Sequence, residues 1–318
     1  MKLIWSALDR TFGSGGIVAY HGVGSRPFTP VMHVSPERLR VQLEFLCDHY
    51  TIVSLRELLE RLQARQPTNT LVAITFDDAY AGIALHALPM LEELGLPATV
   101  FVASDHATVG GTFWWDCAEQ ERVAAQGGQW VRHPQVVGLS PLDGYESRSM
   151  DVLRTRVLAQ FAGRWPGQLD ASDDPEWRSL RFGELEELAR SELIDFGVHT
   201  RSHPSLPALP FDEQVTEIRG NYAILRDRLP RVLPVVAYPY GLYDRGTLRA
   251  ASAAGMIAGV TMEGRATGIR PNLFTLPRIG IGEIHRTSSI ARRLMRAMRM
   301  VLVLRNGGAH PRIPERQP

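Results

Sequence analysis

The sequence predicts an α/β fold assembled from parallel βαβ units. Short apolar runs of β-forming residues alternate with helical patterns over most of the 318 residues, which is typical of a parallel sheet covered by helices. Helix boundaries fall between the runs. Ser35 and Pro36 form an N-cap followed by proline, and Gly95 and Gly255 stand where helices are expected to end.

The expected elements follow one another along the chain. The strand candidates are Gly16–Gly22, Leu71–Phe76, Ala98–Ala103, Asp195–Val198, Val235–Tyr238, Met256–Thr261 and Thr275–Ile281. The helix candidates between them include Pro36–His49, Leu55–Gln63, Ile83–Leu94, Phe182–Ser191, Asp212–Arg228 and Asp244–Ala254.

Residues from about 104 to 180 break this rhythm. They contain two glycine pairs, a tryptophan pair and the acidic stretch Asp170–Glu176, and Met150–Phe161 carries a helical pattern. We interpret this stretch as an insertion within one domain of residues 1–284. A basic amphipathic helix and tail are expected over residues 285–318, where Ile290, Leu294 and Met298 follow helical spacing. A helix packed on the fold is the favoured interpretation, and peripheral contact with an anionic membrane is the alternative.

Composition excludes several classes of protein. A net charge of +1 provides no field that would attract nucleic acid, so we expect no such partner. No apolar run approaches the roughly 20 residues of a membrane span, and Asp9 and Arg10 interrupt the apolar start too early for a secretory signal. We expect a cytoplasmic protein, with peripheral contact to the inner membrane as an option.

Cys47 follows Leu43 and Leu46 in an apolar helical pattern and is expected in the core.

The strongest chemical signal is the segment ITFDDAY, residues 74–80, in which an apolar strand ends in Asp77 and Asp78. Chemistry in α/β barrels collects where strands end. Two carboxylates at such a point can divide their roles, one ligating a metal and the other taking a proton. Adjacent strand residues point to opposite faces, so both can serve one site only if the chain bends after Phe76. The alternative is a pair of turn or helix-capping aspartates.

A second signal is VHTRSHPSL, residues 198–206, where His199 and His203 follow another expected strand end. This spacing can place two imidazoles on one cation. Pro204 favours a loop or a single turn over a long helix. Two histidines and one aspartate would leave open metal positions for water and substrate, as a catalytic site requires. The alternative is two surface histidines.

Two further strand ends carry weaker signals. In AYPYGLYD, residues 237–244, Pro239 must end its strand, and the turn that follows can present a backbone N–H to a developing oxyanion. The alternative is a strand-terminating turn without a chemical role. His21 closes the first strand in VAYHGV, at the same end of the sheet, although a single histidine is more often structural.

Taken together these motifs resemble the polysaccharide deacetylase family, carbohydrate esterase family four. The order is TFDD, then HTxxH, then a PYG turn, and the layout is similar over roughly residues 16–281. PATVFV at residues 97–102 and LPRIG at residues 276–280 add to the likeness. It looks especially like the branch whose members begin with a YHxV strand and occur with polysaccharide biosynthesis. The resemblance implies a distorted (β/α) barrel of about seven strands.

The resemblance also implies the site residues. Asp78, His199 and His203 would hold a divalent metal, Asp77 would be the general base, and Tyr240 would offer its backbone N–H to the oxyanion. Many members carry an arginine two residues before the motif proline, where this chain has Ala237. We hypothesise that Arg278 replaces it.

A late histidine that serves as general acid in many family members is also missing before His285. In the YHxV branch the N-terminal histidine takes over, so His21 inherits that role. Zinc is the expected metal because a His₂Asp set with open positions suits it, and nickel, cobalt or manganese are chemically acceptable.

The function implied is a metal-dependent hydrolase that removes N-acetyl groups from an N-acetylated sugar or polysaccharide intermediate. One alternative is a deacylase or deformylase of a small or lipid-linked amino sugar, and another is a degenerate barrel that only binds glycan. Trp114, Trp115 and Tyr243 are candidate platforms for the substrate's sugar rings. Packing of the insertion is the alternative role for the two tryptophans.

Overall fold

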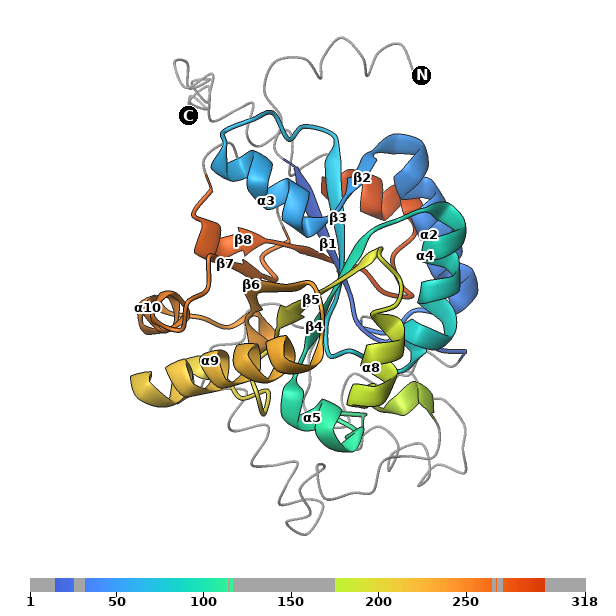
Figure 1. Cartoon of the computed structure of the whole chain (residues 1–318). Helices are drawn as coiled ribbons and strands as arrows, with labels where there is room; N and C mark the ends of the chain where they lie inside the picture. The colour runs from blue at the N-terminus through green and yellow to red at the C-terminus, as the bar shows by residue number, and fades with distance from the viewer. Residues whose placement is uncertain are drawn as a thin grey trace, which may run out of the picture.

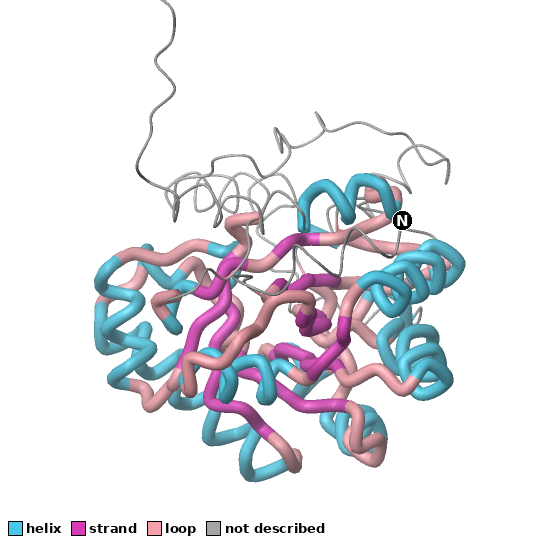
Figure 2. The backbone as a smooth tube through the Cα atoms, turned by 90° about the horizontal axis from the view of Figure 1, so that it is seen from above, coloured by secondary structure: helices cyan, strands magenta, loops and turns pink. Residues whose placement is uncertain are grey.

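The computed structural model describes residues 15–25, 32–113, 115–116, 175–264, 267 and 271–294. In this part of the chain the backbone forms a nearly closed barrel of parallel strands surrounded by helices (Figures 1 and 2). The strands are β1 (Gly16–Tyr20), β2 (Thr51–Val53), β3 (Leu71–Phe76), β4 (Ala98–Val102), β5 (Ile194–Val198), β6 (Val232–Ala237), β7 (Ala258–Thr261), β8 (Leu276–Pro277) and β9 (Ile279–Gly280).

Apart from the short helix Ser104–Val109, which the sequence did not predict, the helices between the strands lie within a few residues of where the sequence predicts them. They are α2 (Pro36–His49), α3 (Leu55–Gln63), a π-helical turn (Ile83–Ala87) continuous with α4 (Leu88–Leu94), α5 (Ser104–Val109), α8 (Phe182–Leu188), α9 (Phe211–Arg228) and α10 (Arg245–Ala253). The hydroxyl of Ser35 caps α2 by accepting from the Arg38 N–H, and Gly95 ends α4 in the left-handed conformation. Helices α9 and α10 pack together on one side of the barrel, away from α2 and α4 (Figure 1).

The strand order is β8-β7-β6-β5-β4-β3-β1-β9, and every pairing in it is parallel. Its two end strands, β8 and β9, are separated in the chain by Arg278 alone, so one short segment pairs with β7 and then with β1. This short segment therefore lies between β7 and β1 and nearly closes the barrel. The predicted (β/α) barrel is confirmed, with eight strands along this path and β2 paired to β3 beside it.

Alternation along the strands separates the barrel interior from the helix-covered exterior. On β3, Ile74 and Phe76 join the cluster that contains the apolar residues of α2 and α4, whereas Ala73 belongs to a second cluster. Because side chains alternate along a strand, Thr75 and then Asp77 continue on the Ala73 side. The Thr75 hydroxyl donates to the Val18 carbonyl at 2.8 Å, so this polar side chain is satisfied within the barrel.

Some expectations need correction or fall outside the described residues. Cys47 is exposed, not in the core, because the buried stripe of α2 consists of Leu39, Gln42, Leu43 and Leu46. The helix expected over Met150–Phe161 and most of the insertion lie outside the described residues. In the tail, residues 287–294 are helical, and Ile290 and Leu294 are buried against the core. No helix among the residues that the structure describes is long and apolar enough to cross a membrane.

The contact between Gly82 and the loop after β1 gives a test of the fold. A Cβ at Gly82 would lie 1.7 Å from the carbonyl oxygen of Val23, so Gly82→Ala must push two backbone segments apart. We expect the free energy of unfolding in urea to fall by about 2–3 kcal/mol. Gly183→Ala is the matched control, because nothing lies within 4 Å of its Cβ. Its place in α8 should yield a gain of about 0.5–1 kcal/mol. Equal stabilities for the two variants would contradict the packing described.

Candidate active site

The candidate site lies where several parallel strands end at the same side of the barrel. Asp77 and Asp78 follow β3, His199 and His203 follow β5, and His21 follows β1. Since the strands are parallel, their carboxyl ends meet at one face, which is where α/β barrels carry their chemistry.

A bend after Asp77 brings both aspartates to this face. Asp78 has a φ of 66° and Ala79 a φ of 49°, a left-handed conformation that non-glycine residues rarely adopt. The bend is held from the returning end of the insertion, since the Leu180 N–H donates to the Ala79 carbonyl at 2.8 Å and the Ser179 hydroxyl lies 3.4 Å from the Asp78 carbonyl. The turn that the sequence required after Phe76 is therefore present.

Asp78, His199 and His203 form a compact group that could hold a metal ion. The two histidine Nε2 atoms are 3.2 Å apart, and Asp78 Oδ1 lies 3.3 Å from that of His199 and 3.4 Å from that of His203. Ligands about 2.0–2.1 Å from a tetrahedral zinc are separated by about 3.3 Å. The three ligand atoms form a triangle whose sides, 3.2, 3.3 and 3.4 Å, match that separation. All three residues are buried.

The hydrogen bonds around the group direct lone pairs to its centre. His199 Nδ1 lies 2.8 Å from the Ala237 carbonyl oxygen, which can only accept, so Nδ1 carries the proton and Nε2 presents a lone pair. Among the described residues, Asp78 Oδ1 is buried without a hydrogen-bond partner. Lone pairs that converge on one point are stabilised by a cation placed there, so the donor set fits a divalent metal.

Electrostatics in the group favour an ionised Asp78 and a neutral His203, whereas they favour the protonated form of His199. Burial acts to raise the pKa of Asp78, but contact with His199 and the charges of both imidazoles outweigh it and hold that pKa below its usual range. Burial lowers the pKa of His203 to about 3, so its imidazole is neutral near pH 7. Burial also acts to lower the pKa of His199, but the nearby Asp78 raises it above its ordinary value. A cation bound at the centre would displace any proton held there.

Two residues that sequence reasoning missed support the histidine loop. Thr200 has a φ of 64° and His203 a φ of 56°. The Thr200 hydroxyl donates to the His199 carbonyl and accepts from the His203 N–H, at 2.5 and 3.1 Å. The Asn221 side chain on α9 accepts from the His199 N–H at 3.3 Å and donates to the Val102 carbonyl at 3.0 Å. Asn221 is a polar residue in the buried stripe of α9, which follows i, i+3, i+4 spacing. This position was the sequence signal that could have identified it.

Asp77 is paired with Arg278. Two guanidinium nitrogens of Arg278 donate to the two carboxylate oxygens of Asp77, each at 2.6 Å, and a further contact reaches the Thr75 hydroxyl at 3.2 Å. Arg278 is fully buried. Burial acts to raise the pKa of Asp77, but the Arg278 guanidinium and the neighbouring histidines lower it below its ordinary value.

His21 lies beside the proposed base. Its Nε2 is 3.8 Å from Asp77 Oδ2, and 14% of its side chain is exposed. Burial lowers the pKa of His21, partly offset by the charges of Asp77 and Asp78. The structure thus places the first strand's histidine against Asp77, on the solvent-accessible side of the site.

The aromatic candidates separate into two groups. Tyr240 has a φ of 60°, and its ring centroid lies 4.7 Å from that of His203. The Trp115 ring meets His203 edge-on at 5.2 Å and Tyr240 at 5.9 Å. Tyr243 packs instead on Tyr238 and its hydroxyl contacts the Glu263 carboxylate. Trp114 lies outside the described residues.

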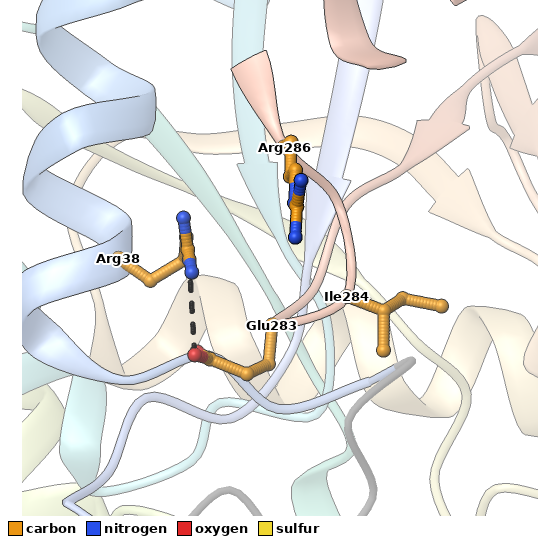
Figure 3. Close-up of a pocket in the computed structure, with 4 residues that line it drawn as sticks. All are labelled: Arg38, Glu283, Ile284 and Arg286. Carbon is orange, nitrogen blue, oxygen red and sulfur yellow. Dashed lines mark ion pairs between the residues drawn. The ribbon is translucent and has the colours of Figure 1, made fainter. Parts of the chain in front are cut away.

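A polar pocket of about 280 Å³ lies elsewhere, between α2 and the segment after β9 (Figure 3). It is lined by Arg38, Glu283, Ile284 and Arg286 and contains none of the predicted site residues. Arg38 Nε lies 3.7 Å from Glu283 Oε1. The other carboxylate oxygen accepts from the Ser35 N–H and hydroxyl at 2.8 and 2.9 Å. Glu283 is therefore engaged in fastening this segment to the start of α2.

Comparison with known proteins agrees with the motifs. The family model described as polysaccharide deacetylase matches residues 64–134 and 163–259, more than half of the chain. YxkH of Bacillus subtilis, a protein named as a polysaccharide deacetylase, is 20% identical over 267 residues, which cover 83% of this chain and 70% of YxkH.

Solved structures share the fold. The deacetylase PplD of Streptococcus pyogenes, solved in complex with acetate, superposes with a TM-score of 0.60 at 19% identity and covers 89% of this chain and 99% of its own. A de-N-acetylase of Aggregatibacter actinomycetemcomitans superposes with a TM-score of 0.57 at 16% identity and covers 88% of this chain and 99% of its own.

The triangle of ligand atoms predicts one divalent cation per chain. Calorimetric titration with zinc, together with elemental analysis after dialysis, should show a single tight site in the wild-type protein. His203→Ala should weaken binding by at least about 100-fold, because it removes one of three ligands. His49→Ala, which changes an exposed histidine at the end of α2, is the control and should bind as the wild type does. Equal affinity in both variants would contradict the assignment.

Proposed function

We propose that this chain, which belongs to the polysaccharide deacetylase family, uses a divalent cation to hydrolyse the acetamide of an N-acetylated sugar or polysaccharide intermediate. Membership of this family makes it a hydrolase of carbon–nitrogen bonds other than peptide bonds. The observation that carries the proposal is a buried Asp78–His199–His203 triangle of metal-ligand spacing with the carboxylate of Asp77 beside it.

The ligands and the cation have separate tasks. Asp78, His199 and His203 would hold the ion, and two nitrogens with one carboxylate oxygen suit zinc, with nickel, cobalt or manganese as acceptable replacements. When bound, such an ion lowers the pKa of water toward neutrality and polarises an amide carbonyl.

Asp77 is the proposed general base. Its lowered pKa keeps the carboxylate ionised near pH 7, so it can take a proton from the attacking water. The remaining hydroxide equivalent bonds to the acyl carbon. Arg278 donates to both carboxylate oxygens of Asp77. We propose that it orients the base, in place of the arginine that many family members carry at the position of Ala237.

His21 and Tyr240 complete the proposed chemistry. An amide nitrogen leaves poorly unless it is protonated, and His21 in its protonated form would donate that proton as the carbon–nitrogen bond breaks. The products are acetate and a free amine. The turn at Tyr240, where φ is 60°, would direct the Tyr240 backbone N–H to the developing oxyanion. Such an interaction contributes about 10²–10³ in rate.

The substrate assignment is supported by the relatives and by the position of the Trp115 ring beside His203. PplD was solved with acetate and the Aggregatibacter protein is a de-N-acetylase, which favours acetyl as the acyl group. Trp115 beside His203 would contact the substrate. Roles for Trp114 and Tyr243 in sugar binding, and membrane contact through residues 285–318, stay predictions.

Acetate release tests the function directly. Purified protein with restored zinc should release acetate from N-acetylglucosamine oligomers, and chelation should abolish it. Asp77→Asn should reduce kcat by at least about 10³ while zinc content is unchanged, because the amide cannot accept the proton. His49→Ala is again the neutral control. Tight zinc binding without acetate release would reject the N-acetyl substrate, and a fully active Asp77→Asn protein would reject the base.

Arg278 can be tested through the pH profile. Removing its charge takes away the interaction that lowers the pKa of Asp77, so that pKa must rise. In Arg278→Met the acid limb of kcat/KM should therefore move to higher pH by at least about one unit. Arg278→Lys keeps the charge but loses the two-point contact, so kcat should fall by about tenfold with a smaller shift. Melting temperatures are needed alongside, since breaking a buried pair costs about 3–5 kcal/mol. A folded Arg278→Met protein with the wild-type profile would refute the role.

A further inference from the structure

A short chain of hydrogen bonds connects the insertion to the segment that carries the metal ligand Asp78. The Trp115 indole Nε1 donates to the Tyr80 hydroxyl at 2.9 Å, and that hydroxyl contacts Asp116 Oδ2 at short range. Tyr80 and Asp116 are fully buried, and Trp115 is half-buried. The sequence motifs did not single out Tyr80 or Asp116.

The donors and acceptors in this chain have one consistent arrangement. An indole N–H can only donate, so the Tyr80 oxygen accepts from Trp115. The single phenolic proton of Tyr80 is then directed to Asp116, which accepts it as a carboxylate. Each member of the chain therefore fixes the next.

The indole held in this way borders the candidate site. It stacks on Phe113 with ring centroids 4.7 Å apart and planes 13° from parallel. Its ring centroid is 5.2 Å from that of His203 and 5.9 Å from that of Tyr240. Trp115 thus contacts both the metal ligand and the residue proposed to hold the oxyanion.

Tyr80 is fixed relative to the ligands by the backbone. It lies two residues after Asp78 and pairs with Ser179 in an isolated β-bridge, next to the bend at Ala79. Its ring also packs against His33, with centroids 5.2 Å apart. His33 Nε2 lies 3.7 Å from the other oxygen of Asp116. A displacement of the phenol would therefore disturb several buried contacts, which makes it a firm anchor for the indole.

We propose that Tyr80 and Asp116 are positioning residues that hold the Trp115 indole as the wall against which the N-acetylated sugar binds. The role of the wall rests on the proposed function, whereas the clamp on the indole does not. Because neither Tyr80 nor Asp116 touches the substrate, their loss should act on substrate affinity through Trp115. Zinc content should be unaffected, because Asp78, His199 and His203 keep their contacts.

A double-mutant cycle separates this role from general packing. Tyr80→Phe keeps the ring and removes the hydroxyl, and should raise KM about five- to tenfold with kcat and zinc content unchanged. In the Trp115→Phe background, which has no indole N–H, the same change should have no further effect on KM. Asp116→Asn keeps an acceptor oxygen for Tyr80 and should stay within about twofold of the wild type, whereas Asp116→Leu should match Tyr80→Phe. Tyr222→Phe, on the outer helix α9, is the matched control.

A second readout does not require turnover. The fluorescence of Trp115, obtained as the difference between wild type and Trp115→Phe, should be quenched by acrylamide about twofold more strongly in Tyr80→Phe and unchanged in Tyr222→Phe. If the wild-type protein releases no acetate, the proposed function fails. The quenching measurement still tests whether Tyr80 and Asp116 hold the Trp115 indole. Unchanged quenching in Tyr80→Phe, or additive effects on KM in the cycle, would overturn the proposal.

Discussion

The buried ion pair between Asp77 and Arg278 links the architecture of the barrel to its candidate site. Arg278 is the residue between β8 and β9, so the segment that closes the barrel is also the one that supplies the guanidinium. A fully buried arginine is strongly unfavourable without a partner. Asp77 can satisfy it only if β3 and the closing segment are both in place. Closure of the barrel and orientation of Asp77 therefore depend on each other.

The site also depends on backbone conformations that are unfavourable in isolation. Asp78, Thr200, His203 and Tyr240 all have positive φ values, and each such residue costs about 1–3 kcal/mol. Asn221 and Thr200 support the histidine loop by accepting hydrogen bonds from the backbone N–H groups of His199 and His203. Strained turns at three strand ends place side chains that a regular strand would direct elsewhere. A site formed in this way is arranged before substrate binds, which is the condition for electrostatic catalysis.

The sequence predicted most of the fold because periodicity and caps acted locally. Helices α2 and α3 match their expected bounds, since serine N-caps mark both starts. Strand β2 was missed because it has three residues and only Val53 is buried. Cys47 was placed wrongly because the stripe of α2 includes the polar Gln42. Thr200 and Asn221 could not be assigned because their roles depend on tertiary contacts. Arg278 was proposed from an absence in the motif, and its contact with Asp77 required the closed barrel.

The two adjacent aspartates differ in the charge that each already faces. Asp77 is neutralised by the permanent cation of Arg278, at 2.6 Å from both oxygens. Asp78 faces His203, which is neutral near pH 7, and His199, whose pKa is raised, and its Oδ1 has no hydrogen bond among the described residues. A divalent cation would therefore be attracted to Asp78 and not to Asp77, whose carboxylate would stay ionised beside it. The proposed division into ligand and base follows from the surroundings, because the two side chains are chemically identical.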